Sequence, residues 1–391
     1  MHNKCNSSGV KFDDVSNDGT ISLIFLVLLL IKIKDLNNKM YNLPEISEVI
    51  EPQIVEQIID HIDNSGRIVI TTHLSPDGDA IGSSLALYHF IKNRGKNVMI
   101  IVPNSFPYFL KWMAGANDIE IFEYNPSAGY QILTNADLIF SLDYNILKRA
   151  GDMCSALEDS KATKIMIDHH PSPGENFDIV VSKPQISSTS ELIFRFFYQA
   201  GRYDEITKAE AESIYCGMMT DTGGFTYNSA NPEIYEIISM LLRKDIDKDA
   251  IYSNVFNNYS EERFRLLGFT LSQRMEVYHD KHSALLYLSN EDQSQFRFSK
   301  GDTEGFVNYP LSIKGIIFST FIREEEGMVK LSFRSQKSFR CNEFASEFFN
   351  GGGHVNASGG EFQGSLEEAL KIYSKGLEKY KERLKAAVKE D

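Results

Sequence analysis

The chain has 391 residues, 42% of them hydrophobic, which is enough for two domains of ordinary size and argues against a largely disordered protein. Its 40 basic and 54 acidic side chains give a formal net charge of -14, which disfavours long duplex DNA as a partner because the chain would repel a polyanion at long range. Short RNA or a small nucleotide needs only a few local cationic contacts, so these ligands are compatible with the charge.

Residues 1–39 form an N-terminal extension whose place in the mature protein the sequence leaves open. Its apolar stretch, residues 21–31, is eleven residues long and falls short of the ~20 that a spanning helix needs. Acidic residues precede the stretch and no small-residue cleavage site follows it, which argues against an export signal. We therefore expect no stable association with a membrane.

The cysteines are scattered along the chain and form neither a C-x-x-C pair nor a dense disulfide pattern; they are Cys5, Cys154, Cys216 and Cys341. This spacing favours a reducing cytoplasm as the location of the protein. A homo-oligomer is compatible with the sequence, which contains no feature that sets the oligomeric state.

Short β-branched or apolar runs alternate with helix-length segments in the first half of the chain, as in repeated βαβ units. The expected strands are residues 67–72, 98–102, 137–142 and 164–167, and the expected helices are residues 81–92, 191–200 and 208–220. This pattern predicts an α/β domain over residues 40–245, with a mainly parallel sheet and helices on both faces.

The segment after residue 245 becomes charged and helical without a strand pattern, which predicts a helical linker over residues 246–280. A second, smaller α/β domain is expected over residues 281–391, and the two domains would form a cleft. Its expected strands are residues 283–288, 315–322 and 328–334. Ser365 and Glu368 form a capping-box pattern that opens the last helix.

The first predicted strand is followed by His73, Asp77 and Asp79 within seven positions, and Gly78 allows a tight turn there. Ligands of open α/β sheets gather at the carboxyl ends of the strands, so this loop is well placed for a binding site. The competing interpretation is a turn followed by a helix N-cap, because Pro-Asp-Gly is a common turn sequence and Asp favours helix starts. Taken alone, the loop would favour that interpretation.

Two further strands end in the same kind of residue, which favours a functional site. Asp143 follows the strand that ends at residue 142, and the triplet Asp168-His169-His170 follows the strand that ends at residue 167. Asp221 lies at the end of a helix before two glycines, where it could equally stabilise a turn. We include Asp221 as a ligand only together with the other residues.

Carboxylates brought together in this way repel one another and raise one another's pKa, so their assembly requires compensating positive charge. Imidazole and carboxylate ligands without cysteine favour a catalytic transition-metal site over a thiolate zinc site. Two divalent ions ~3.5–4 Å apart can ionise a bridging water and hold phosphoryl oxygens, as phosphate ester hydrolysis requires. We expect two divalent metal ions, with Mn as the first choice and Mg, Co or Zn as alternatives, bound by His73, Asp77, Asp79, Asp143, His169 and Asp221.

The ordered set of motifs resembles the DHH phosphoesterase superfamily. The H-x-x-x-D-x-D motif at 73–79, Asp143, the Asp168-His169-His170 triplet and Asp221 resemble its four motifs, over residues 66–225. Residues 330–335 and 351–360 resemble the DHH-associated C-terminal domain, so the resemblance covers residues 45–385. Within the superfamily, the chain looks most like the bacterial nanoRNase and 3′-phosphoadenosine 5′-phosphate phosphatase group.

The resemblance implies roles for the individual residues. One metal ion would be bound by His73, Asp77 and Asp143, and the other by Asp79, Asp143, His169 and Asp221. Asp143 would bridge the two ions. The catalytic roles fall to His170, which would face the scissile phosphate, and to Asp168, which would orient an imidazole through a hydrogen bond.

In the second domain, the resemblance implies that the substrate is bound by Arg334, Gly351, Gly352, Gly353, His354 and Ser358. A run of glycines exposes backbone N–H groups to a phosphate, and an arginine offers a bidentate fork. The competing interpretations are a surface turn for the glycines and an exposed ion pair with a glutamate for Arg334.

The leading hypothesis is a hydrolase that releases 5′-mononucleotides from very short RNA or converts 3′-phosphoadenosine 5′-phosphate to AMP. The alternative is a cyclic or linear dinucleotide phosphodiesterase, which the same catalytic residues could serve with a reshaped second domain. An inorganic pyrophosphatase ranks third, because it would leave the glycine-rich segment unexplained. The alternative of another class is a nucleotide-binding module without catalysis, which the intact metal ligands disfavour.

Overall fold

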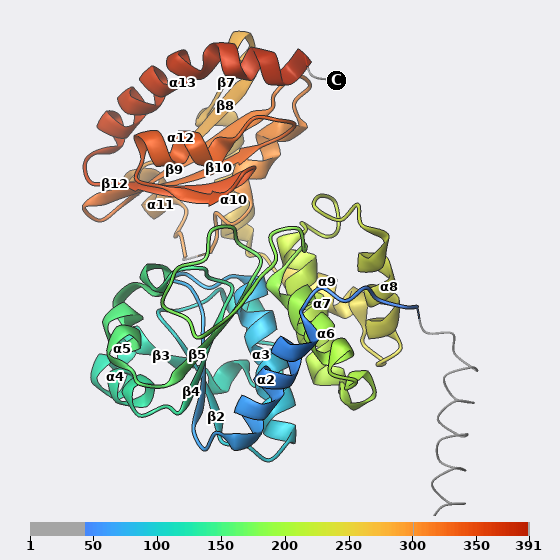
Figure 1. Ribbon diagram of the computed structural model, residues 1–391. Coiled ribbons are helices and arrows are strands. Elements are labelled where there is room, and N and C mark those ends of the chain that lie inside the picture. Colours follow the sequence, from blue (N-terminus) through green and yellow to red (C-terminus); the bar gives the residue numbers. More distant parts are fainter. Residues whose placement is uncertain (1–43, 300, 390–391) are drawn as a thin grey trace, which may run out of the picture. The chain divides into compact units, whose positions relative to one another are not determined.

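The computed structural model describes residues 44–299 and 301–389, and residues 46–391 form one compact unit that contains two β-sheets (Figure 1). The predicted N-terminal extension, residues 1–39 with the apolar stretch 21–31, lies outside the described residues. Within the described part of the chain, no helix combines the length and the hydropathy needed to cross a membrane. The predicted α/β class, with a mainly parallel sheet and a second sheet, is confirmed.

The first sheet has six strands, all parallel, in the order β3-β2-β1-β4-β5-β6. The strands are β1 (Ile68–Thr71), β2 (Val98–Val102), β3 (Glu120–Ile121), β4 (Leu138–Leu142), β5 (Thr163–Asp168) and β6 (Ile179–Ser182). β1 and β4 are buried along their whole length, as expected of apolar strands that helices cover on both faces. Sequence analysis missed β3, which has only two residues, and β6, which has four residues like β1 but, unlike β1, is not buried along its whole length.

Helices cover both faces of the first sheet, as Figure 1 shows. They are α2 (Pro52–Asn64), α3 (Gly78–Asn93), α4 (Pro126–Thr134), α5 (Cys154–Asp159), α6 (Thr189–Gln199) and α7 (Lys208–Asp221). α4 and α5 lie on one face, α2 and α3 lie on the other, and α6 and α7 pack against α3. The expected helices 81–92, 191–200 and 208–220 are therefore present, with ends shifted by a few residues.

Along the chain, three helices follow α7 and precede the first strand of the second sheet. They are α8 (Pro232–Leu242), α9 (Lys248–Phe256) and α10 (Glu261–Gln273). The sequence predicts residues 246–280 to be helical throughout, which is wrong at the end of the segment, where strand β7 (Met275–Tyr278) forms. β7 is a partly exposed edge strand of four residues, so its sequence lacks the pattern of a buried strand. The domain boundaries at residues 245 and 280 remain predictions.

The second sheet has the order β11-β12-β10-β9-β8-β7 and is antiparallel except between β8 and β9. Its other strands are β8 (Ser283–Leu288), β9 (Phe318–Glu325), β10 (Met328–Ser335), β11 (Gly352–His354) and β12 (Ala357–Phe362), and α11 (Asn290–Gln295) lies between β8 and β9 in the sequence. The helices α12 (Cys341–Phe348) and α13 (Leu366–Lys389) share a core with the sheet that includes Phe318, Phe333, Phe344 and Tyr373. β9 begins three residues later than predicted, after Gly315 turns the chain in the left-handed region (φ 86°).

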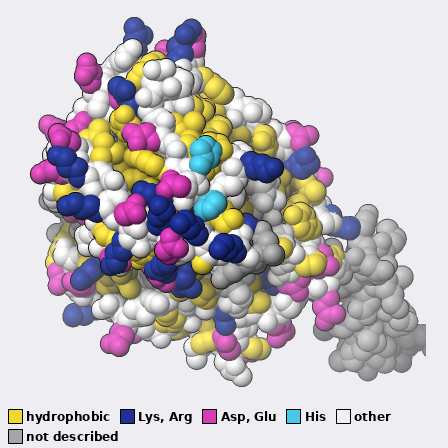
Figure 2. Space-filling view, turned by 90° about the horizontal axis from the view of Figure 1, so that it is seen from above, with side chains coloured by type: hydrophobic (Ala, Val, Ile, Leu, Met, Phe, Trp, Pro, Cys, Tyr) yellow, Lys and Arg dark blue, Asp and Glu magenta, His cyan; other side chains and the backbone are white. Residues whose placement is uncertain are grey.

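Acidic and basic side chains intermix on the face of the molecule shown in Figure 2. The surface of α13 carries ion pairs, among them Lys371 with Glu367 and Lys381 with Asp280. Pairs as exposed as these add ~0–1 kcal/mol each to stability. Their main effect is therefore to neutralise charge locally.

A buried ion cluster lies where α6 meets α8. Arg195 is completely buried, and its guanidinium lies 2.8 Å from Glu191 Oε1 and 2.7 Å from Glu233 Oε2. Burial raises the pKa of Glu233, but the hydrogen bonds from Arg195 and Ser47 outweigh it, so the pKa of this carboxyl is lowered. The cluster therefore depends on the one arginine that both carboxylates share.

We expect Arg195→Met to lower the free energy of unfolding by about 3–5 kcal/mol, because it leaves the carboxylate of Glu191 buried without its partner. Urea unfolding measures the change. Arg202→Met is the matched control: it removes only the exposed pair with Glu205 and should cost less than about 1 kcal/mol. In the wild type, the contribution of Glu233 is complete above the ordinary carboxyl pKa and is lost as the pH falls through the lowered pKa. Equal unfolding curves for Arg195→Met and the wild type would contradict this account.

Candidate functional site

The loop after β1 supplies both a helix cap and a carboxylate of the site. Asp77 is the N-cap of α3, and its Oδ1 accepts hydrogen bonds from the backbone N–H groups of Asp79 and Ala80, both at 3.0 Å. The same oxygen lies 4.0 Å from His73 Nε2, and the side chain is half exposed. The N-cap interpretation is therefore correct for Asp77, and it does not exclude a ligand role.

Gly78 is required by close packing and not by a turn of unusual backbone geometry, which corrects the sequence-based reason for it. It is the first residue of α3, and a Cβ there would lie 2.3 Å from Thr220 Oγ1. Thr220 directly precedes Asp221 at the end of α7. The glycine thus lets the start of α3 lie against the end of α7, which brings Asp221 toward the loop after β1.

The N-terminus of α6 holds two carboxylates of the site. Asp79 is buried, and its carboxylate accepts hydrogen bonds from the backbone N–H groups of Thr189 (2.6 Å) and Ser190 (2.8 Å). The hydroxyl of Thr189 donates to Asp143 Oδ1 at 3.1 Å. A helix N-terminus favours negative charge, so α6 stabilises this pair of acids. Sequence analysis missed this role because it began the helix at residue 191; the capping-box pattern of Ser188 and Glu191 is the signal that it overlooked.

Asp143 lies directly after β4, in the left-handed region of backbone space (φ 65°). Asp tolerates this region better than most residues, and non-glycine residues held there often belong to functional sites. Its two carboxylate oxygens face different histidines: Oδ2 lies 3.3 Å from His73 Nε2, and Oδ1 lies 3.5 Å from His169 Nε2. Asp143 is thus the one carboxylate positioned between His73 and His169.

His73 and His169 are oriented in the same way. The Nδ1 atom of His73 lies 2.9 Å from the carbonyl oxygen of Leu74, and that of His169 lies 3.2 Å from the carbonyl oxygen of Ile186. A carbonyl oxygen can only accept, so each Nδ1 carries the proton, and in a neutral ring Nε2 is left as an acceptor. In both residues this Nε2 faces carboxylate oxygens. Acceptors that face one another need a proton or another cation between them, and a divalent metal ion bound there would replace that proton.

The structure brings all of the predicted metal ligands together in two groups. The first group is His73, Asp77 and Asp143, and the second is Asp79, His169 and Asp221; within each group the candidate ligand atoms lie within 4.8 Å of one another. Nitrogen and oxygen ligands in this mixture suit Mn, Co or Zn. The residues therefore fit the expected cations, although their assignment as ligands remains a prediction.

The acids of the site perturb one another, as four clustered carboxylates should. Burial, together with the charges of Asp143 and Asp221, raises the pKa of Asp79. Burial also raises the pKa of Asp221 to about 7. Burial alone would lower the pKa of His169, but the surrounding carboxylates raise it to about 9. The site thus carries excess negative charge that a bound cation would neutralise.

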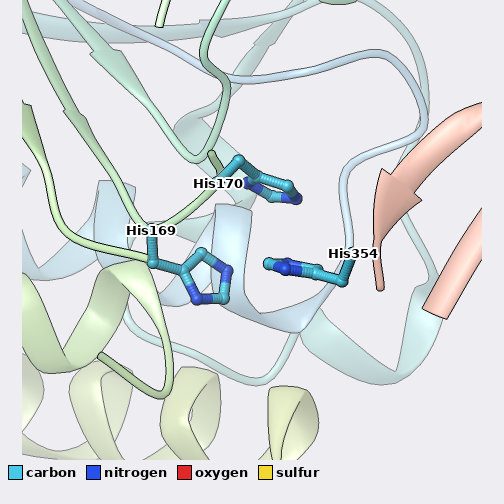
Figure 3. Close-up of side chains that lie close together, drawn as sticks. All are labelled: His169, His170 and His354. Atoms are coloured by element: carbon cyan, nitrogen blue, oxygen red, sulfur yellow. The ribbon is translucent and has the colours of Figure 1, made fainter. Parts of the chain in front are cut away.

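His170, the predicted catalytic residue, is held by Asp168. Its Nδ1 lies 2.7 Å from Asp168 Oδ1, and Asp168 is fully buried. The ring of His354, from β11 of the second sheet, stacks on His170 with centroids 4.2 Å apart, and lies 4.7 Å from the ring of His169 (Figure 3). The predicted orienting contact of Asp168 is therefore present, and three imidazoles from the two sheets converge on one point.

The glycine-rich segment forms a strand where the sequence suggested a loop. Gly352–His354 is the edge strand β11, paired with β12, and the backbone N–H of Gly351 already donates to the carbonyl of Ala345 at 3.1 Å. A Cβ on Gly351 would lie 2.1 Å from the carbonyl oxygen of Gly359, so this glycine serves packing. Ser358 is buried, and its hydroxyl donates to Cys341 Sγ at 3.3 Å. Phosphate binding by Gly351, Gly352, Gly353 and Ser358 remains a prediction.

Two arginines near the site lack a carboxylate partner among the described residues. Arg334 donates only to the carbonyl of Phe333, at 3.0 Å, and its charge acts on Asp221. The alternative of an exposed ion pair for Arg334 therefore fails. The positive charge of Arg149 acts against protonation of His73, His170 and His354; burial, the larger cause, lowers the pKa of His170 and His354, whereas the pKa of His73 is raised by its carboxylate neighbours. Sequence analysis missed Arg149, because it lies in an irregular segment where a single arginine gives no motif.

Two family models match the chain: the DHH family N-terminal domain over residues 67–218, and the DHHA1 domain over residues 283–379. The curated protein "Bifunctional oligoribonuclease and PAP phosphatase NrnA" of Thermus thermophilus is 27% identical over 351 residues, which are 88% of this chain and 98% of the relative. The "Cyclic-di-AMP phosphodiesterase PdeA" of Listeria monocytogenes is 23% identical over 85% of this chain, but the match covers only 50% of that protein.

Among solved structures, an exopolyphosphatase-related protein from Bacteroides fragilis is 53% identical to the chain. The two superpose with a TM-score of 0.83, over 87% of this chain and 100% of the other. The similarity to this solved structure therefore includes both β-sheets and the helices that pack against them.

Proposed function

Since the chain belongs to the DHH family and carries a DHHA1 domain after the DHH domain, we propose that it is a metal-dependent phosphoesterase of short nucleotide substrates. Its substrates would be short oligoribonucleotides, cut to 5′-mononucleotides, and 3′-phosphoadenosine 5′-phosphate, converted to AMP. The name of the Thermus relative, which matches nearly over its whole length, supports this substrate class. The dinucleotide phosphodiesterase alternative has weaker support, because the chain spans half of the relative with that name.

The position of Asp143 between His73 and His169 is the observation that carries the proposal. A carboxylate in this position could bind one cation through each of its oxygens. It would thereby link the two groups of imidazole and carboxylate ligands. We assign one ion to His73, Asp77 and Asp143, and the other to Asp79, Asp143, His169 and Asp221. Bound there, two divalent ions would activate a water molecule and neutralise charge on the phosphoryl oxygens, and Mn is our first choice.

His170 would exchange a proton with the reacting phosphate ester. Its Nδ1 is held by Asp168, so Nε2 is the atom left for the substrate. Burial lowers the pKa of His170, which keeps the ring neutral near pH 7. Asp168 would act through His170 by fixing the plane of the ring and its tautomer.

Arg334 and His354 would bind the part of the substrate beyond the reacting phosphate. The ring of His354 stacks on that of His170, so a phosphate bound by His354 would lie next to the phosphate ester that reacts at His170. The guanidinium of Arg334, free of a carboxylate within the described residues, offers two parallel N–H donors to a second phosphate. Gly351, Gly352, Gly353 and Ser358 complete the proposed set. A cytoplasmic location and a homo-oligomer remain expectations.

The proposal is tested by measuring product release from a substrate panel with the purified full-length chain. The panel contains a diribonucleotide, a long RNA, 3′-phosphoadenosine 5′-phosphate, cyclic di-AMP and inorganic pyrophosphate, each with Mn and with EDTA. We expect the diribonucleotide or the bisphosphate to have the highest kcat/KM, and we expect EDTA to remove the activity and added Mn to restore it. Preferential hydrolysis of cyclic di-AMP or pyrophosphate, or activity that survives EDTA, would contradict the proposal.

A further inference from the structure

Tyr227 is an exposed aromatic residue in the turn that follows Asp221, and the function proposed above gives it no role. Its side chain is 48% exposed, and its ring lies against Gly223, where a Cβ would come within 2.3 Å of the ring. Gly223 is left-handed (φ 56°), so glycine is favoured there by its backbone as well as by the ring. The turn therefore leaves space for one face of the tyrosine ring beside the end of α7.

Hydrogen bonds around Thr222 hold this turn. The hydroxyl of Thr222 donates to the carbonyl of Met218 at 2.7 Å and accepts from the backbone N–H of Phe225 at 3.0 Å. The backbone N–H of Tyr227 donates to the carbonyl of Thr222 at 3.2 Å. These hydrogen bonds fix the backbone of the turn next to Asp221, and the tyrosine that it carries stays partly exposed to solvent.

The contact of the Tyr227 ring with Gly223 places this side chain beside the end of α7, where Asp221 lies, and the charges that act on the ring agree with this position. Burial raises its pKa, the charge of Arg334 lowers it, and the charges of Asp221 and Asp77 raise it. Arg334 also acts on Asp221. Tyr227 therefore lies near both the carboxylates of the candidate metal groups and the arginine assigned to a second phosphate. Its hydroxyl forms no hydrogen bond within residues 44–299 and 301–389, so no polar contact of the protein occupies this end of the ring.

We propose that Tyr227 is a base-stacking residue that positions the nucleoside lying between the two phosphates of the substrate. This inference rests on the proposed function. On this proposal, a nucleoside with one phosphate at the carboxylate and histidine groups and another at Arg334 passes Tyr227, which lies beside Asp221. An exposed aromatic face next to that path suits stacking on a nucleobase, which tolerates any base because every base has a π-face. The site would therefore prefer nucleotides over phosphate esters of the same charge that carry no base.

The test is a double-mutant cycle that combines Tyr227→Leu with a substrate lacking one base. The substrates are a 5′-phosphorylated diribonucleotide and the same molecule with its 5′ base replaced by hydrogen. For the wild type, we expect removal of the base to lower kcat/KM by about 10- to 100-fold, the range that loss of one stacked base produces. Tyr227→Leu should lose a similar factor on the intact diribonucleotide and little on the abasic one, and Tyr227→Phe should retain the wild-type preference.

Tyr235→Leu is the matched control, since Tyr235 lies on α8 with a similar exposure of 51% and should leave both substrates unaffected. A loss of equal size on both substrates in Tyr227→Leu would overturn the stacking role, and so would no loss on either. If the wild type hydrolyses neither the diribonucleotide nor 3′-phosphoadenosine 5′-phosphate, the proposed function is wrong. The stacking role is then decided by calorimetric titration with AMP, where equal affinities of wild type and Tyr227→Leu would overturn it.

Discussion

Replacing Asp143 by alanine is expected to abolish hydrolysis of every nucleotide substrate. Removing a residue that only hydrogen-bonds to a metal ligand lowers activity by about 10- to 100-fold, and the loss of kcat in Asp143→Ala should be larger than that. The reason is that Asp143 has one oxygen toward His73 and the other toward His169, so its removal affects both candidate ion sites at once. The measurement is kcat at saturating Mn, together with the number of Mn ions bound per chain.

The control for Asp143→Ala is Asp249→Ala, which removes a highly exposed carboxylate on α9 and should leave kcat unchanged. Thermal unfolding of both variants without added metal distinguishes a lost site from a lost fold. Activity of Asp143→Ala close to that of the wild type would contradict the shared role of this carboxylate.

His170→Ala is expected to lower kcat by about 10²–10⁴-fold, the range for loss of a proton-transferring side chain. The number of bound Mn ions should stay the same, because His170 is outside both ion assignments. Asp168→Asn should produce a smaller loss, about 10- to 100-fold, because the ring stays in place while the partner of its Nδ1–H changes. Steady-state kinetics with the diribonucleotide compare the two variants. A larger effect of Asp168→Asn than of His170→Ala would show that Asp168 acts in another way.

The sequence predicts that these side chains lie close together, because parallel strands deliver their following residues to one edge of a sheet. His73, Asp143 and His169 come after β1, β4 and β5, which are neighbours in the sheet order, so their meeting follows from the strand pattern alone. Asp221 was ambiguous, because a helix end carries no such constraint. Its inclusion depends on the packing of Gly78 against Thr220, a contact that no local pattern predicts.

Short or glycine-rich strands account for most of the errors in the predicted fold. β3 has only two residues, β6 and β7 are not buried along their whole length, and β11 and β12 contain the glycines that sequence rules assign to turns. In these strands, pairing with a neighbour and not local propensity decides the structure. The roles of Thr189 and Tyr227 were missed for a related reason. Thr189 contacts Asp79 and Asp143, which are distant from it in the sequence, and the position of Tyr227 depends on the shape of a turn.

The most direct test of the account is a crystal structure of the Mn-soaked protein with anomalous diffraction recorded at the manganese edge. We expect two anomalous peaks per chain, ~3.5–4 Å apart, with one oxygen of Asp143 toward each. A single peak, or two peaks that share no carboxylate, would contradict the central claim.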